Sequence, residues 1–302
     1  MGSPAVFSGP IVCGVDFSEH SSRALTRAGA VAHALGVRLV VLTALDPLLN
    51  EAAQSQYGPG TFVEGARRDL STVVQTTLGP RAAGVAVDAI VGDAPKVLLE
   101  GASRAGASIV VVGTQGLGRA ERLVFGSTTL RLMRSTDRPV LAVPPPSAET
   151  ADAGGDALWF DRIVCGIDFS PASDTAARAA VALGQRVSVP VTLVHAAGRA
   201  AVPQAWHLFA ASAADRQTHD ADTRLRELVL SLGEPAPAFE VVPGEAAAVI
   251  DERAPSALIV LGLGGASHHR PGSTAMRILA ATRTPVLTVP EELFRPAVED
   301  IR

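Results

Sequence analysis

A glycine-rich segment with two hydroxyl residues lies in the first half of the chain. Gly113, Gly116 and Gly126 are spaced as Gly-x2-Gly-x9-Gly-Ser, and Ser127 and Thr128 follow the last glycine directly. Glycine lets a backbone approach a ligand closely or take a positive φ. A helix that begins at Ser127 would present free N–H groups and a favourable dipole to a phosphate. The segment therefore predicts a phosphate cradle, although a tight turn capped by Ser127 or Thr128 would use the same residues.

The second half carries a shortened form of this segment. Gly262, Gly265, Gly272 and Ser273 are spaced as Gly-x2-Gly-x6-Gly-Ser, so three residues are missing between the second and third glycines. The glycines and the helix-opening serine are kept, but the predicted cradle is narrower. The second half is therefore expected either to bind the same ligand or to have lost it.

The two glycine segments belong to a long internal repeat. Ile11–Ser18 reads IVCGVDFS and returns as IVCGIDFS at Ile163–Ser170, an offset of 152 residues. The copies also end alike, with RPVLAVP at Arg138–Pro144 and TPVLTVP at Thr284–Pro290. A run rich in Pro, Gly and Ala separates them and has the composition of a linker. We expect a first domain at 1–146, a linker at 147–157 and a second domain at 158–302.

Each copy alternates apolar strand patterns with amphipathic helix patterns, which is typical of α/β folds. Strands that are apolar on both faces, such as Ile109–Val112, belong in a parallel sheet covered by helices on both sides. The chain is therefore expected to be two tandem doubly wound domains, each with a five-stranded parallel sheet flanked by helices. In the first copy we expect strands at 11–15, 38–44, 85–91, 109–112 and 139–143, and helices at 19–35, 62–78, 94–105 and 127–136.

An aspartate follows the first strand of each copy. Asp16 and Asp168 come directly after these strands, and Ser18 and Ser170 come two residues later. Ligands of doubly wound folds bind beyond the carboxyl ends of the strands, where the strand order reverses. Both aspartates are therefore candidates for ligand contacts. They also fit a plain strand-to-helix turn, with Ser18 and Ser170 capping the helices.

The sequence resembles the universal stress protein family in three places. These are the G-2x-G-9x-G-S spacing, the VDFS motif at Val15–Ser18 and the closing RPVLAV at Arg138–Val143. The resemblance spans nearly the whole chain, as a tandem pair of domains. It implies the adenine nucleotide alpha hydrolase-like fold, with the strand order 3-2-1-4-5 in each domain. It also implies that the two domains pair through their last strands.

The same resemblance implies where a nucleotide would bind. Asp16 would lie against the nucleoside, the backbone near Ala44 would meet adenine, and the glycines with Ser127 would hold ribose and phosphates. The expected cofactor is ATP, with or without Mg²⁺. The cofactor-binding residues expected on this basis are Gly14, Val15, Asp16, Ala44, Gly113, Gly116, Gly126, Ser127 and Thr128 in the first copy, and Asp168, Ala196, Gly262, Gly265, Gly272 and Ser273 in the second.

Common catalytic motifs are missing from the sequence. Lys96 is the only lysine and follows no glycine-rich loop, which excludes a P-loop with its phosphate-binding lysine. There is no G-x-S-x-G or H-E-x-x-H motif either. No catalytic residue is therefore expected. Adjacent histidines such as His268 and His269 rarely chelate one ion well, so no metal site is expected.

Four further residues fit two interpretations each. His195 would either line the second pocket or be a hydrogen-bonded structural histidine. The other three are arginines, which would either contact phosphates or be ordinary exposed residues. They are Arg119, Arg122 and Arg270.

Charge and composition exclude other function classes. A net charge of −4 and an aromatic content of 4% give no support for nucleic-acid binding. No apolar run approaches the roughly 20 residues that span a bilayer, and the N-terminus lacks a signal-peptide pattern. Cys13 and Cys165 lie in apolar segments, so a disulfide framework is not expected. We therefore expect a cytoplasmic protein.

These features favour an ATP-binding regulatory protein of the stress-response type. ATP in the first copy would change the contacts between the domains or the binding of an unknown regulatory protein, and two chains could pair as a homodimer. Two alternatives stay open. One is a slow ATPase or adenylate-using enzyme, and the other is a nucleotide-free interaction module.

Overall fold

The computed structural model describes residues 6–114, 126–145, 158–198, 207–264 and 273–294, and it gives the side chains of all of these except 207–214 and 273. The first half contains β1 (Ile11–Gly14), α1 (Glu19–Leu35), β2 (Leu39–Leu45), α2 (Pro47–Tyr57), α3 (Thr61–Leu78), β3 (Ala86–Val91), α4 (Ala94–Ala105), β4 (Ile109–Gly113), α5 (Ser127–Ser135) and β5 (Val140–Val143). The second half contains β6 (Arg162–Gly166), α6 (Pro171–Val187), β7 (Val191–Ala197), α7 (His207–Leu232), β8 (Ala238–Pro243), α8 (Ala246–Asp251), β9 (Ala257–Leu263), α9 (Ser273–Ala281) and β10 (Val286–Pro290). Each half is an α/β unit, as the sequence predicts.

The first helix of each half begins at a serine cap. The Ser18 hydroxyl accepts a hydrogen bond from the N–H of Ser21 in α1 (3.1 Å), and the Ser170 hydroxyl accepts one from Ser173 in α6 (3.2 Å). Such a cap satisfies an N–H group that the helix itself cannot satisfy. α1 ends at Gly36 with a φ of +66°, a left-handed conformation that glycine adopts without strain. The strand-to-helix turns of the two halves are therefore built alike.

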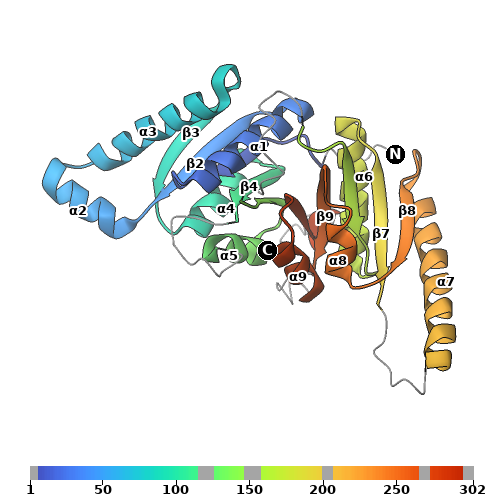
Figure 1. Cartoon of the computed structure of the whole chain (residues 1–302). Helices are drawn as coiled ribbons and strands as arrows, with labels where there is room; N and C mark the ends of the chain where they lie inside the picture. The colour runs from blue at the N-terminus through green and yellow to red at the C-terminus, as the bar shows by residue number, and fades with distance from the viewer. Residues whose placement is uncertain (1–5, 115–125, 146–157, 199–206, 265–272, 295–302) are drawn as a thin grey trace, which may run out of the picture.

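The hydrophobic pattern does not predict α2. Asp46 caps this helix by accepting hydrogen bonds from the N–H groups of Leu48 (2.8 Å) and Leu49 (3.1 Å), and Pro47 is its first residue. None of its residues is buried. α2 packs beside α3 at the outer end of the first half (Figure 1). Its large apolar residues Leu48, Leu49 and Tyr57 are exposed, so the helix has no buried apolar face.

All ten strands form one sheet, in the order β3-β2-β1-β4-β5-β10-β9-β6-β7-β8. Each half is parallel and follows the predicted order 3-2-1-4-5 when its strands are numbered along the chain. The halves join where β5 pairs antiparallel with β10, with Leu141 opposite Leu287. The Thr288 hydroxyl donates a hydrogen bond of 3.1 Å to the carbonyl oxygen of Val140 across this junction. The implied pairing of last strands is therefore present, and it merges two parallel sheets into one mixed sheet.

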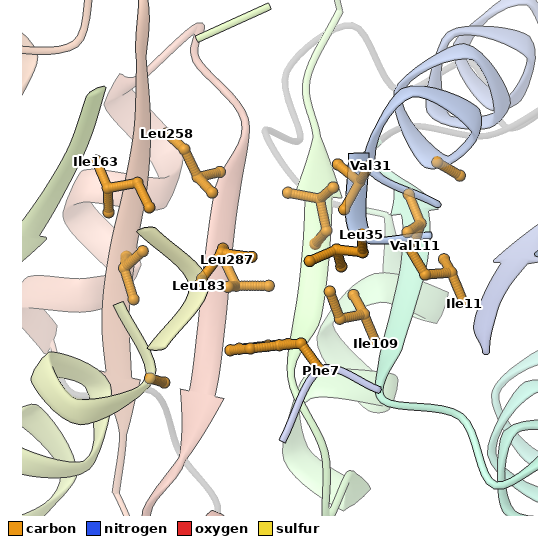
Figure 2. Close-up of a cluster of buried hydrophobic side chains, with 14 of the residues drawn as sticks. Phe7, Ile11, Val31, Leu35, Ile109, Val111, Ile163, Leu183, Leu258 and Leu287 are labelled. Carbon is orange, nitrogen blue, oxygen red and sulfur yellow. The ribbon is translucent and has the colours of Figure 1, made fainter. Parts of the chain in front are cut away.

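Helices cover both faces of this sheet (Figure 1). α1, α3, α6 and α7 pack on one face, and α4, α5, α8 and α9 pack on the other. Figure 2 shows the core of the first face, where Phe7 lies between residues of the first half, such as Ile109, and residues of the second, such as Leu287. Arg186 of α6 also donates a hydrogen bond of 2.9 Å to the Leu35 carbonyl at the end of α1. The two halves therefore share one continuous hydrophobic layer.

The strands of the first half run opposite to those of the second, because β5 and β10 are antiparallel while each half is internally parallel. The carboxyl ends of the first-half strands therefore lie at one end of the strands, and the carboxyl ends of the second-half strands lie at the opposite end. Ligands of such folds bind beyond the carboxyl ends. The two candidate sites are consequently separate, and each must be built by its own half.

Candidate functional site

Asp16 and the start of the glycine-rich segment lie side by side at the carboxyl edge of the first half. In the parallel pairing of β1 with β4, Cys13 lies beside Val111, and the strands end shortly afterwards, β1 at Gly14 and β4 at Gly113. β2 and β3 lie on one side of β1, and β4 and β5 lie on the other. The strand order therefore reverses between β1 and β4, and this is the switch point at which doubly wound folds bind ligands.

The turn that follows Asp16 holds its carboxylate in place. Oδ1 of Asp16 accepts hydrogen bonds from the Ser18 hydroxyl (2.5 Å) and from the Ser18 N–H (3.1 Å). Asp168 makes the same two contacts with Ser170, at 2.6 and 3.0 Å. Asp16 is half-buried, and Asp168 is the more exposed of the two. Both aspartates therefore have the turn role that was one of their two interpretations, and this role fixes the Asp16 carboxylate beside the switch point.

The pKa of Asp168 reflects two opposing effects. Partial burial raises the pKa of this carboxyl, but hydrogen bonds from Ser170 and Ser173 outweigh that effect, and the pKa lies below its ordinary value. Hydrogen bonds to a carboxylate stabilise the charged form. Asp168 is therefore a carboxylate at neutral pH.

A phenylalanine in a left-handed conformation follows each aspartate. Phe17 has a φ of +64° and Phe169 a φ of +62°. A residue with a side chain is strained in this region, at a cost of roughly 1–3 kcal/mol. The same strain at the same place in both halves shows that the tight Asp-to-Ser turn sets the backbone there.

His195 packs beneath this turn in the second half. Its Nδ1 lies 2.8 Å from the carbonyl oxygen of Ile167, so Nδ1 carries a proton that it donates. Its ring lies 4.5 Å from the ring of Phe169, and the Arg224 guanidinium lies 4.0 Å from the centre of the Phe169 ring. His195 therefore has the hydrogen bond that its structural interpretation requires.

Two hydrogen bonds tie the end of β4 to the start of α5. The Thr129 hydroxyl donates to the Gly113 carbonyl (2.9 Å), and the Gly126 N–H donates to the Thr114 carbonyl (2.6 Å). Gly126 has a φ of −64°, so it does not use the left-handed freedom of glycine. A Cβ at Gly126 would lie 3.4 Å from the Thr114 carbonyl oxygen, an ordinary contact. The described neighbours therefore do not require glycine at this position.

The first turn of α5 has no side-chain cap. Gly126 occupies the cap position and has no side chain to accept from the helix N–H groups. Ser127 is exposed and Thr128 is half-buried. The first N–H groups of a helix lack partners within the helix, and together with the helix dipole they favour an anion. This end of α5 is therefore suited to a phosphate.

Three more predicted residues lie at the same edge. Gly14 ends β1, and a Cβ there would lie 2.9 Å from Cδ1 of Leu98, so close packing is one reason for this glycine. Val15 is buried, and its N–H donates to the Leu42 carbonyl (2.9 Å). Ala44 is half-buried near the end of the pairing between β2 and β3. The main chain of these residues lies beside the switch point, on the side of β2.

Gly262 of the second half is required by close packing. A Cβ at Gly262 would lie 2.4 Å from the backbone carbonyl of Ala172, so the packing of β9 on α6 requires glycine there with or without a ligand. Leu263 is buried and stands where the first half has Thr114. Ala196 is half-buried near the end of β7. Packing is therefore one reason for the glycine at this position of the second half.

Several predicted residues lie outside the described residues. These are Gly116, Arg119, Arg122, Gly265, His268, His269, Arg270 and Gly272. Ser273 is described only as the first residue of α9.

An ion pair that the motif search missed ties α5 to the start of α4. Nη1 and Nη2 of Arg131 lie 2.8 and 2.9 Å from the two carboxylate oxygens of Asp93. The second half has an equivalent pair, with Arg277 3.0 Å from Glu245. Glu245 follows Asp93 by the same number of residues as Ile163 follows Ile11. Arg277 follows Arg131 by the same number of residues as Gly272 follows Gly126. A residue-by-residue comparison of the copies would have found both pairs.

The described part of the chain gives no basis for metal or thiol chemistry. Within it, no three His, Cys, Asp or Glu residues come together as a group that could hold a metal ion. Burial raises the pKa of Cys13 and of Cys165 well above the ordinary value, so both are thiols and not nucleophilic thiolates at neutral pH. Among the helices described, none is long and apolar enough to cross a membrane.

The fold and the site define a tandem pair of doubly wound α/β domains, each with an aspartate and a glycine at the switch point of its sheet. The sequence model of the universal stress protein family matches residues 8–144 and again residues 160–290. The chain therefore belongs to the universal stress protein family and contains two copies of its domain.

Known relatives resemble either one half or the whole chain. The "Universal stress protein in QAH/OAS sulfhydrylase 3'region" of Thermus aquaticus is 30% identical over 141 residues, covering 44% of this chain and 96% of that protein. The crystal structure of a universal stress protein from Archaeoglobus fulgidus covers 94% of this chain and 99% of its own, with a TM-score of 0.67 and 18% identity. A universal stress protein solved in complex with cAMP is 24% identical, covers 45% of this chain and 97% of its own, and has a TM-score of 0.34. The Archaeoglobus structure shows that the tandem fold occurs elsewhere.

Proposed function

We propose that the first half binds ATP beyond the carboxyl ends of β1 and β4, and that the chain is a nucleotide-dependent regulatory protein of the stress response. One observation carries this proposal. The Asp16 carboxylate, the end of β4 at Gly113 and the uncapped start of α5 at Ser127 meet at a single switch point. Each of these features suits a different part of a nucleotide.

The roles follow from the chemistry of each group. The Asp16 carboxylate would accept hydrogen bonds from ribose hydroxyls, while Ser18 keeps it in position. The main chain at Ala44 would pair with the edge of adenine. The free N–H groups of the first turn of α5 would bind phosphate oxygens, and the exposed Ser127 hydroxyl would add a donor.

Gly126 supports the phosphate assignment. Its backbone conformation is open to any residue, and the described packing leaves room for a Cβ. A side chain at this position would project beside the first turn of α5, where the phosphates would bind. Close approach of the ligand to the backbone would favour a glycine at this position.

A magnesium ion would enter with the nucleotide. Mg²⁺ usually keeps several waters and binds through substrate phosphates and one or two carboxylates. The triphosphate would therefore be the main ligand of the ion.

The second half would bind nucleotide weakly or not at all. Its glycine-rich segment is three residues shorter, and packing is one reason for Gly262. Ala275 stands where Thr129 ties α5 to β4 in the first half. We propose that residues 1–146 form the nucleotide-binding unit and that residues 158–302, joined through 147–157, form a partner domain.

Calorimetric titration of the full chain with ATP, ADP, AMP and cAMP tests this function. Asp16→Ala is expected to weaken ATP binding at least about tenfold, the effect of losing one or two hydrogen bonds to a charged group. Asp168→Ala removes the same turn contacts from the other half and serves as the matched control. We expect it to leave the affinity unchanged. Equal affinity in the wild type and Asp16→Ala would exclude the proposed site.

A further inference from the structure

Two side-chain contacts hold the start of α5, where the proposed phosphate site lies. The Thr129 hydroxyl binds the Gly113 carbonyl at the end of β4 (2.9 Å). Arg131, one turn into the helix from Ser127, makes the two-pronged ion pair with Asp93 at the start of α4 (2.8 and 2.9 Å). The first contact fixes the helix against the sheet, and the second fixes it against the neighbouring helix.

The second half retains only one of these contacts. Ala275 replaces the threonine and offers no hydroxyl. Arg277 nevertheless pairs with Glu245 at 3.0 Å, although the segment before α9 is three residues shorter. Glu245 also caps α8, because its side chain accepts a hydrogen bond from the Ala248 N–H (3.2 Å). The ion pair is therefore the contact that both halves share.

Stability alone does not explain this ion pair. The side chains of Arg131 and Asp93 are 58% and 46% exposed, and ion pairs this exposed contribute little to the stability of a fold. A bidentate arginine–carboxylate pair, however, fixes direction as well as distance. Its geometric effect on α5 is therefore larger than its energetic effect on the fold.

We infer that Arg131 and Asp93 are positioning residues for the nucleotide site. Their ion pair fixes the orientation of α5. In this orientation the N–H groups of its first turn can donate hydrogen bonds to phosphate oxygens. Neither side chain needs to touch the nucleotide. This inference rests on the proposed function, because it concerns the same site.

A double-mutant cycle on ATP affinity tests the inference. Arg131→Met keeps the apolar stem and removes the charged fork, and Asp93→Asn removes the carboxylate charge. Each is expected to weaken ATP binding by about 3- to 10-fold while the melting temperature changes by less than about 2 °C. The double variant should bind no more weakly than either single variant, because both changes break one contact.

Arg67→Met is the matched control. Arg67 pairs with Asp88 at 2.8 Å, and the two side chains are exposed to a similar degree, but the pair lies on α3 and the edge strand β3. The control should bind ATP like the wild type. Wild-type affinity in Arg131→Met, or an equal loss in Arg67→Met, would overturn the inference and leave the proposed function standing. A wild-type chain that binds no ATP would overturn the proposed function itself.

Discussion

The hydroxyl of Thr129 donates a hydrogen bond of 2.9 Å to the carbonyl oxygen of Gly113. Thr129 lies in the first turn of α5, and Gly113 is the last residue of β4. The two ends of the glycine-rich segment are therefore joined by a single side chain. We expect the geometry of the proposed phosphate site to depend on this bond.

Thr129→Val tests that dependence. Valine keeps the shape of threonine but leaves the Gly113 carbonyl without its partner. We expect the free energy of unfolding to fall by about 1 kcal/mol and ATP affinity to fall by about tenfold. Urea unfolding and calorimetric titration measure the two effects.

Thr72→Val is the control for Thr129→Val. Its hydroxyl donates to the Arg68 carbonyl on the exposed surface of α3 (3.1 Å), so its loss should not change ATP affinity. If Thr129→Val also binds ATP like the wild type, the bond to Gly113 has no part in nucleotide binding.

We expect the protein to become more stable when Thr114 is replaced by an apolar residue of the same shape. Its side chain is buried, and its hydroxyl has no hydrogen-bond partner among the described residues. The second half has Leu263, also buried, at the equivalent position. Because a buried unpaired hydroxyl costs free energy, Thr114→Val should raise the free energy of unfolding by about 1 kcal/mol.

The reverse change, Leu263→Thr, should lower the free energy of unfolding by about 1–3 kcal/mol, because it places a hydroxyl in an apolar site. Both variants can be compared by urea unfolding without ligand. A loss of stability in Thr114→Val would show that the hydroxyl has a favourable partner in the folded chain.

The junction between the halves is expected to make unfolding cooperative. Leu141 and Leu287 face each other across β5 and β10, and both are buried. Leu287→Ala should destabilise the protein by about 2–5 kcal/mol, and adding Leu141→Ala should cost less than the sum of the single changes. Leu230→Ala, at a residue that is 81% exposed, should have little effect. Two separate unfolding transitions in the wild type would contradict a shared core.

Asp168 and Asp174 should affect stability in opposite ways as the pH changes. For Asp168, partial burial raises the pKa, but hydrogen bonds from Ser170 and Ser173 outweigh it and the net pKa is lowered. For Asp174, burial raises the pKa and exceeds the lowering effect of two nearby arginines. A lowered pKa stabilises the fold above the unfolded value of about 3.9, and this contribution is lost as the pH falls.

Asp168→Asn should therefore destabilise the protein at pH 7, and its effect should shrink towards pH 3. A raised pKa has the opposite sign, so Asp174→Asn should stabilise the protein at pH 7 and have little effect at pH 3. Guanidinium unfolding at the two pH values measures both. The same sign for the two variants at pH 7 would contradict these assignments.

The repeat and the apolar periodicity were enough to predict most of the fold. The expected strands and helices of the first half agree with the structure to within one or two residues, because each buries a clear apolar face. α2 escaped prediction because it buries no residue, although Asp46 before Pro47 is an N-terminal helix signal. The junction of β5 with β10 came from family resemblance, since strand patterns do not reveal which edges pair.

The site was predictable only where a motif marks it. Asp16 and Gly113 could be proposed as site residues because the repeat and the glycine spacing single them out. Thr129 and the Arg131–Asp93 pair were missed because their roles depend on contacts between elements that are distant in the sequence. Gly262 is also required by its close approach to Ala172, a packing role that depends on a contact between distant parts of the sequence.

The most direct test of the central claim is to count the nucleotide that one chain carries. Freshly purified full-length protein would be denatured, and the released nucleotide identified and quantified by mass spectrometry against the protein concentration. We predict about one adenine nucleotide per chain, held by the switch point of the first half, and a loss of that nucleotide in Asp16→Ala. A wild-type chain that releases no nucleotide, and that binds none when titrated with ATP, would contradict the claim.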